Sequence, residues 1–242
     1  MADLRNYQTR AQTGEMIDQG LRSYMLKVYN LMALGLAITG VAAFLSFQLA
    51  FADGQLTAFG QAIYVSPLKW VVILAPLALV FFLSFRIGRM SVSAAQTTFW
   101  VYAALVGLSL SSLLLIYTGE SVVQTFFITA ASFGALSLYG YSTKRDLSAM
   151  GSFLIMGLFG LIIASLVNIF LASSAMQFAI SVIGVLIFAG LTAYDTQRIK
   201  EMYFEADDVA VAGRKAIIGA LTLYLDFINL FMFLLQFLGN RR

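Results

Sequence analysis

The sequence predicts an all-α membrane protein, a seven-transmembrane-helix bundle. Hydrophobic residues make up 60% of the chain and charged residues 11%, whereas soluble domains carry about 25% charged residues. Seven apolar runs fill most of the chain, and each is close to the ~20 residues that a helix needs to cross a bilayer. We therefore interpret residues 1–242 as one integral membrane domain. Residues 1–27 form an N-terminal segment, residues 28–238 the bundle and residues 239–242 a tail.

The apolar runs define the predicted spans and their order. They cover residues 28–52, 68–85, 97–117, 121–141, 150–171, 176–196 and 216–238. Most connections are short, which makes consecutive helices antiparallel neighbours. Pro76 predicts a kink in the second span. The last run could be a full span or a re-entrant segment with both termini inside. We favour a full span, because the run has no proline and its only glycine, Gly219, lies near its start.

Basic residues predict the orientation of the bundle. Twelve of the 15 lie before the first span or in alternate connections. They are Arg5, Arg10, Arg22, Lys27, Arg86, Arg89, Lys144, Arg145, Arg198, Lys200, Arg214 and Lys215. The positive-inside rule then puts the N-terminus in the cytoplasm. Because topology accounts for these charges, we expect no nucleic-acid partner.

Two aspartates carry the chemistry that this sequence offers. Asp226 is the eleventh residue of the 23-residue last run, and Asp195 closes the preceding run. An aspartate at the centre of a span costs about 2.5–3.5 kcal/mol on insertion scales and usually faces a bundle interior or an ion path. We expect a functional role for Asp226. Asp195 could equally lie at the cytoplasmic interface, and meets Asp226 only if its helix continues past Thr196.

Other polar residues lie where they could support an ion path or simply join helices. Thr222, Asp226 and Asn229 share one helical face of the last run. Asn168 is a polar residue in the fifth span. Small and polar residues also let membrane helices approach and hydrogen-bond, so both interpretations stay open. Arg86 and Arg89 end the second span, either as interface anchors or as partners of a buried carboxylate.

Three ordered motifs resemble those of the Bax inhibitor-1-like (transmembrane Bax inhibitor motif) family. They read YGYSTKRDLS at residues 139–148, AYDTQ at 193–197 and LYLDFINLF at 223–231. The resemblance extends from about residue 21 to residue 242. It implies a bundle in which helix seven is central, and a bacterial cytoplasmic (inner) membrane protein.

The resemblance also implies a function, because bacterial members of the family are regarded as pH-sensitive calcium-leak proteins. Asp195 and Asp226 would then form a proton-sharing pair that meets the transported Ca²⁺, without a permanently bound cofactor. An arginine at the end of helix two, here Arg86 or Arg89, is linked to closure. The alternative is a regulator that moves no ions and restrains a membrane protease or the cell-death machinery by binding a membrane-protein partner.

Physical chemistry supports such a pair independently of the family. Two close carboxylates in a low-dielectric site cannot both ionise cheaply, so they share a proton. A hard cation such as Ca²⁺ offsets their repulsion when both are ionised. The pair is therefore an element that pH and Ca²⁺ can bias.

We expect no enzymatic activity. The chain has no cysteine and no histidine, which excludes thiol and imidazole catalysis. An intramembrane aspartyl protease also carries aspartates on helices six and seven, but its second aspartate follows a Gly-x-Gly motif. Here Asp226 follows Tyr224 and Leu225, and the only prolines, Pro67 and Pro76, leave no Pro-Ala-Leu element.

Overall fold

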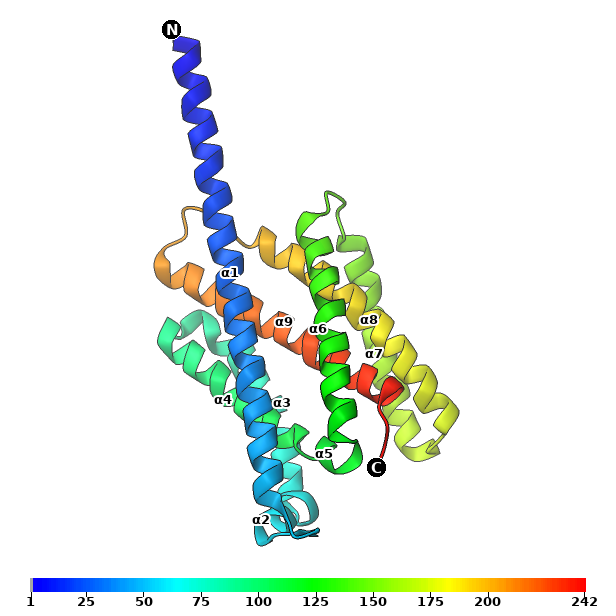
Figure 1. The fold of residues 1–242 in the computed structure, drawn as a ribbon. Coiled ribbons are helices and arrows are strands. Elements are labelled where there is room, and N and C mark those ends of the chain that lie inside the picture. Colours follow the sequence, from blue (N-terminus) through cyan, green and yellow to red (C-terminus); the bar gives the residue numbers. More distant parts are fainter. Residues whose placement is uncertain (1) are drawn as a thin grey trace.

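The computed structural model describes the backbone of residues 2–242 and the side chains from residue 18 onward. The side chains of Arg5 and Arg10, used above for orientation, lie outside this part. Seven helices are long and apolar enough to cross a membrane, and they lie side by side (Figure 1). They are α1 (Ala2–Ala50), α3 (Leu68–Arg86), α4 (Val92–Leu110), α6 (Gly119–Ser142), α7 (Ser148–Leu171), α8 (Ser174–Glu201) and α9 (Val209–Leu238). The predicted all-α class and the seven spans are confirmed.

Short elements occupy connections that the sequence left undefined. The antiparallel strands β1 (Phe51–Ala52) and β2 (Gln55–Leu56) form a hairpin after α1. Its turn is Asp53-Gly54, both with positive φ, the residue pair that suits a two-residue hairpin turn. The remaining short elements are α2 (Ala58–Gly60), a π-helical turn (Gln61–Val65), a 3₁₀ turn (Ile87–Arg89) and α5 (Leu113–Ile116).

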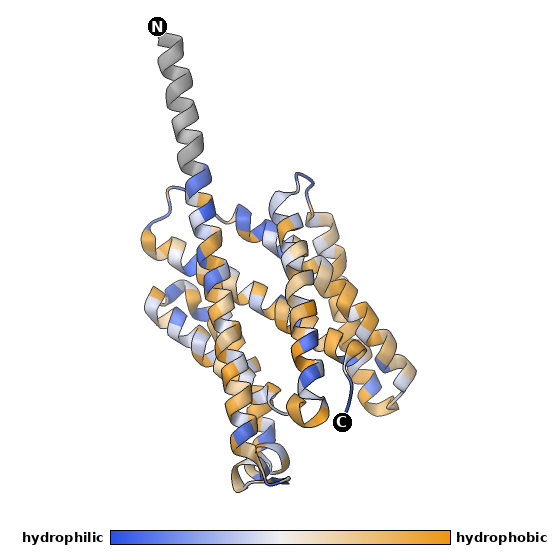
Figure 2. Ribbon diagram, in the orientation of Figure 1, coloured by the Kyte–Doolittle hydropathy of each residue, from blue (hydrophilic) through white to orange (hydrophobic). Residues whose placement is uncertain are grey.

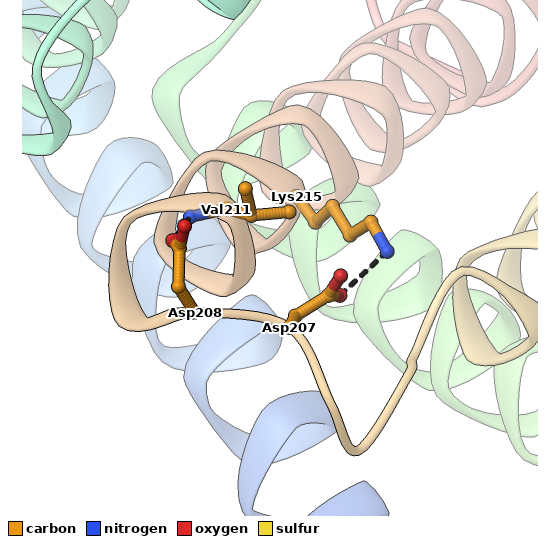
Figure 3. A network of polar contacts seen from close by, with 4 residues as sticks. All are labelled: Asp207, Asp208, Val211 and Lys215. Carbon is orange, nitrogen blue, oxygen red and sulfur yellow. Dashed lines mark hydrogen bonds and ion pairs between the residues drawn. The ribbon is translucent and has the colours of Figure 1, made fainter.

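Several helix ends differ from the predicted spans, because hydropathy reports only the apolar part of a helix. Helix α8 continues five residues beyond the predicted end at Thr196, and α9 begins seven residues before residue 216. The first turn of α9 is short of the apolar run but well capped by the acids that precede it. Asp208 accepts a hydrogen bond from the Val211 amide (2.7 Å), and Lys215 pairs with Asp207 (2.5 Å; Figure 3). The predicted third span is in fact divided into α4 and α5, whereas α3 continues through Pro76.

Helix α9 is the most buried of the seven spans. In its most apolar 18-residue window 56% of the residues are buried, against 17% in α3 and 11% in α7. It packs mainly on α1, α4, α6 and α8, whereas α3 packs on α4 and α7 on α8. That all six other helices surround α9 stays a prediction. Hydrophobic residues cover most of the helical surface and hydrophilic residues gather mainly near helix ends (Figure 2), as a bilayer requires.

The C-terminal tail lies at the end of the bundle opposite the N-terminus (Figure 1). Its backbone pairs with the α5–α6 turn, where the Thr118 amide donates to the Asn240 carbonyl (3.1 Å) and the Arg242 amide to the Ile116 carbonyl (2.9 Å). Helix α9 has no break near Asp226, so the structure agrees with a full span rather than a re-entrant segment. Which end faces the cytoplasm stays a prediction.

Candidate functional site

Asp195 of α8 and Asp226 of α9 meet across the interface of their helices. Both side chains line one cavity between these helices. Asp226 is only 4% exposed, and its Oδ2 has no hydrogen-bond partner among the described residues. Asp195 is half-buried. A buried, unpartnered carboxyl oxygen is costly and rare, which sets this pair apart from ordinary helix contacts.

The extension of α8 brings the two acids together. Asp195 lies six residues before the end of α8 at Glu201, not at its final turn as the hydropathy alone suggests. The condition stated above, that this helix continues past Thr196, is fulfilled. Consecutive antiparallel helices can then place a residue near the end of one beside a residue well inside the next.

The last turn of α6 and the α6–α7 connection hold the end of α8 by three hydrogen bonds. The Gln197 side chain accepts from the Leu147 amide (2.9 Å) and donates to the Arg145 carbonyl (2.8 Å). Lys200 Nζ donates to the Tyr141 carbonyl (2.8 Å). Residues from the first motif of the family resemblance therefore fix the helix that carries Asp195.

Close backbone contact fixes the same turn of α8 from two other sides. Gly140 of α6 packs directly on the backbone of Ala193, so closely that a Cβ at Gly140 would overlap the Ala193 carbonyl. Gly151 of α7 packs on the ring of Tyr194, where a Cβ would also overlap. Only glycine permits these approaches, so α6 and α7 both constrain the turn just before Asp195.

Helix α9 is held by Tyr224, two residues before Asp226. The Tyr224 hydroxyl lies 2.6 Å from Thr39 Oγ1 of α1, which donates to the Ala103 carbonyl of α4 (2.9 Å). The rings of Phe99 and Tyr102 contact the Tyr224 ring edge to face, each with centroids 5.7 Å apart. Helices α1 and α4 thus fix the rotation of α9 at Tyr224.

A cavity of about 610 Å³ between α7, α8 and α9 contains the pair. Thr222 and Asn229 line it, as the helical spacing predicted. Thr222 Oγ1 donates to the Ile218 carbonyl (3.0 Å), and Asn229 Nδ2 donates to the Leu225 carbonyl (2.8 Å). Their donors are therefore used within α9, and their oxygens remain acceptors that suit a cation rather than an anion.

Arg198 is a site residue that the sequence interpretation missed. We expected it to be an interface anchor, but it lines the cavity with the two acids. It lies one helical turn after Asp195, yet forms no ion pair within 4 Å with either acid. Its position three residues after Asp195 on a helix is the signal that could have revealed it.

The two arginines proposed as gate partners lie away from the pair. Both Arg86 and Arg89 are exposed, and neither lines the cavity. The Arg86 guanidinium instead lies over the ring of Phe82, 5.9 Å from its centroid. A role for either arginine in closure stays a prediction, and would require α3 to move toward α8 and α9.

Asn168 also lies away from the pair, in a network that we call the amide cluster (Asn168, Gln177, Ser181 and Gln236). Asn168 donates to Gln177 Oε1 (3.1 Å) and accepts from the Ser173 amide (3.0 Å). Gln236 Oε1 accepts from Gln177 Nε2 (2.9 Å) and Ser181 Oγ (3.2 Å). The cluster joins α7, α8 and α9, so the structure favours the packing interpretation of Asn168.

Oxygen ligands for a metal ion are few at the pair. Within the part of the chain that the structure describes, no three or more acidic residues gather as a metal-binding group. Ca²⁺ prefers six to eight oxygen ligands, of which two carboxylates supply only some. The arrangement suits transient contact with a partly hydrated cation better than tight retention.

Comparison with known proteins gives consistent relatives along the chain. The sequence model of the family described as inhibitor of apoptosis-promoting Bax1 matches residues 21–242. An uncharacterized protein of Rickettsia prowazekii is 53% identical over 248 residues, which cover all of both chains. The inner membrane protein YbhL of Escherichia coli strain K12 is 47% identical over 225 residues, 92% of this chain and 94% of the relative.

A third relative, an uncharacterized protein of Caulobacter vibrioides, is 49% identical over 93% of this chain and 92% of its own length. Seven apolar helices and these relatives together identify a multi-pass integral membrane protein of the bacterial inner membrane.

Proposed function

Because this chain belongs to the Bax inhibitor-1-like family, we propose that it is a pH-sensitive calcium leak whose gate is the Asp195–Asp226 pair. The observation that carries the proposal is the buried carboxyl pair, in which Asp226 Oδ2 has no protein donor. A carboxylate in such a place is expensive in a membrane. Such an acid is expected to serve proton or cation handling rather than helix packing.

The first state is one in which the two acids share a proton. One carboxyl then donates to the other, which joins α8 and α9 and leaves a single negative charge facing the cavity. Arg198 stays apart from the pair, as in the described arrangement. A cation can approach the acceptor oxygens of the pair, Thr222 and Asn229 along the uncovered cavity. This state conducts.

The second state forms when both acids lose their proton. Two adjacent negative charges repel and require a nearby positive charge. Arg198 already lines the same cavity, and its guanidinium can bind both carboxylates and occupy the cation path. Arg86 or Arg89 would add to this closure if α3 moved inward. Calcium flux should therefore fall as pH rises, and high Ca²⁺ should oppose closure by competing for the acids.

Calcium entry into dye-loaded proteoliposomes tests the proposal. Wild-type protein alone should admit Ca²⁺, with flux falling between about pH 6 and pH 8. Asp226→Asn should remove this pH dependence, because the remaining acid no longer has an ionisable neighbour. The control is Gln236→Leu, outside the cavity, which should keep the pH dependence. Asn229→Asp is not a suitable control, since it adds an acid to the cavity. Absence of flux from folded protein at every pH would reject a leak.

A second candidate function is a regulator that binds a partner helix and moves no ions. The observation that favours it is the poor burial of α3, in which only Pro76 and Leu83 are buried, while Trp70 and Phe85 are exposed. Lipid covers such a surface as well as a partner helix does. Flux from the purified protein separates the two functions, because a regulator alone would show none.

A further inference from the structure

A second hollow region lies between α1 and α6 and shares no lining residue with the carboxylate cavity. It consists of two adjoining hollows of about 620 and 640 Å³ that both include Ala33. We call it the α1–α6 groove. Its first half is lined by the Arg22 end of α1 and by α6 from Phe133 to Tyr141, and its second half reaches Phe44. Each half has the size of a small-molecule site.

The first half of the groove is apolar with a positively charged mouth. Arg22 lines it directly. Lys200 lies beside the same mouth, because its Nζ bonds the Tyr141 carbonyl (2.8 Å) and lies 5.2 Å from the centroid of the Tyr141 ring. Asp18, one turn before Arg22, forms no ion pair with it among the described side chains. The mouth therefore complements an anionic group.

Two hydroxyl groups lie deeper in this half. Tyr29 and Ser137 both line it, with their oxygens 2.7 Å apart, and Ser137 Oγ lies 2.9 Å from Thr196 Oγ1. Tyr29 follows Arg22 by seven residues, which is about 10 Å along the helix and on the same face. A basic group at the membrane surface matches the phosphate of a phospholipid. Because the Thr196 hydroxyl donates to the Thr192 carbonyl (2.7 Å), the Tyr29 and Ser137 hydrogens are used within this chain, and their oxygens add polarity at the depth of the lipid ester groups.

Two glycines leave space in the groove that no neighbouring residue fills. Gly134 lines the first half and Gly40 the second. An added Cβ at either position would meet nothing within 4 Å. Unlike Gly140, these glycines are not required by helix packing, and their effect is to leave the apolar groove unfilled at both positions.

We propose that the α1–α6 groove binds one anionic phospholipid from the leaflet on the Arg22 side. Its phosphate lies at Arg22 and Lys200, its ester region at Tyr29 and Ser137, and an acyl chain follows the apolar residues past Gly134. The occupant is a lipid rather than a partner helix, because the groove combines a positively charged mouth, polar oxygens at ester depth and an apolar lining beyond them. This site does not depend on the proposed leak.

Native mass spectrometry of the full-length protein, with phosphatidylglycerol or phosphatidylcholine added to the detergent, tests this site. Wild type should retain one phosphatidylglycerol and little phosphatidylcholine. Gly134→Leu should lose this adduct, because its side chain fills the groove. The matched control is Gly160→Leu on α7, where a Cβ also meets nothing within 4 Å but no part of the groove is altered; it should retain the lipid.

A second variant tests the positive charge at the mouth of the groove. It keeps the lipid-site proposal testable if Gly134→Leu fails to fold. Arg22→Gln should reduce the preference for phosphatidylglycerol over phosphatidylcholine about fivefold, the effect expected of one basic residue near an anionic lipid surface. Arg89→Gln, another exposed arginine outside the groove, should leave it unchanged. Equal retention of the two lipids by wild type, or an unchanged preference in Arg22→Gln, would overturn the proposal.

Discussion

The carboxylate pair and the amide cluster both lie on α8 and α9, but their polar groups are satisfied to different degrees. In the amide cluster, Gln236 and Asn168 each have partners across a helix interface. At the pair, Asp226 Oδ2 is buried without a partner. Polar groups with complete hydrogen bonding join membrane helices. An unsatisfied acid between the same helices supports the proposal that this group gains and loses a proton or a cation.

The strongest test of this contrast is the exchange of acid for amide at the pair. Asp195→Asn and Asp226→Asn should each abolish the pH dependence of calcium flux. In each variant the remaining aspartate has no second carboxyl group with which to share a proton. Flux assays across the same pH range measure this result. If Asp195→Asn kept the wild-type pH profile while Asp226→Asn lost it, the response would belong to Asp226 alone and not to a pair.

Removal of a partner from the amide cluster should reduce stability and leave gating intact. Gln236→Leu deprives Gln177 Nε2 and Ser181 Oγ of their shared acceptor. The expected loss of unfolding free energy is about 1 kcal/mol, since hydrogen bonds between membrane helices average ~0.6 kcal/mol with a maximum near 1.7. Unfolding in mixed micelles measures the loss. A Gln236→Leu protein with an altered pH profile would contradict the separation of the two regions.

Arg198 provides a finer test at the pair. Arg198→Gln should leave the flux at low pH near the wild-type value and weaken its decrease at high pH, because the guanidinium is proposed to act only on the doubly ionised pair. Flux profiles of this variant and of the control Arg214→Gln, which lies outside the cavity, measure the difference. An unchanged profile in Arg198→Gln would assign closure to another cation, with Arg86 and Arg89 the next positions to replace.

The smallest expected effect lies outside the spans, at the start of α7. Hydrogen bonds from the Ser148 side chain and backbone amide hold the pKa of Asp146 below its usual value. Because this pKa is lower in the folded state, the stabilisation is present above the unfolded pKa near 4 and disappears as pH falls through the folded value. Asp146→Ala should therefore lower Tm slightly at neutral pH and by less at about pH 3. An equal decrease at both pH values would contradict this assignment.

Much of the fold follows from the sequence because apolar length is a direct signal in a membrane. All seven spans were predicted, but the polar ends of α8 and α9 were not, since their capped turns lie outside the apolar runs. The meeting of Asp195 and Asp226 depended on one of those ends. Thr222 and Asn229 were placed correctly by helical spacing.

The remaining site features depend on how helices pack, which periodicity alone does not specify. Gln236 near the end of α9 gave no sign that it would meet Gln177, because the partner is on another helix. Asn168 was assigned to either of two roles for the same reason. The groove between α1 and α6 arises from the separation of two helices, which no residue pattern in the sequence predicted.

The most direct measurement of the central claim is the protonation of the pair itself. Infrared difference spectroscopy of the purified protein in lipid, at neutral pH, should detect the C=O band of a protonated carboxylic acid. In Asp195→Asn and in Asp226→Asn this band should be absent, or shifted because the remaining acid has lost its carboxylate partner. The band should decrease as pH rises, in step with calcium flux. A wild-type spectrum with no protonated carboxyl over the range in which flux changes would contradict a shared proton as the gate.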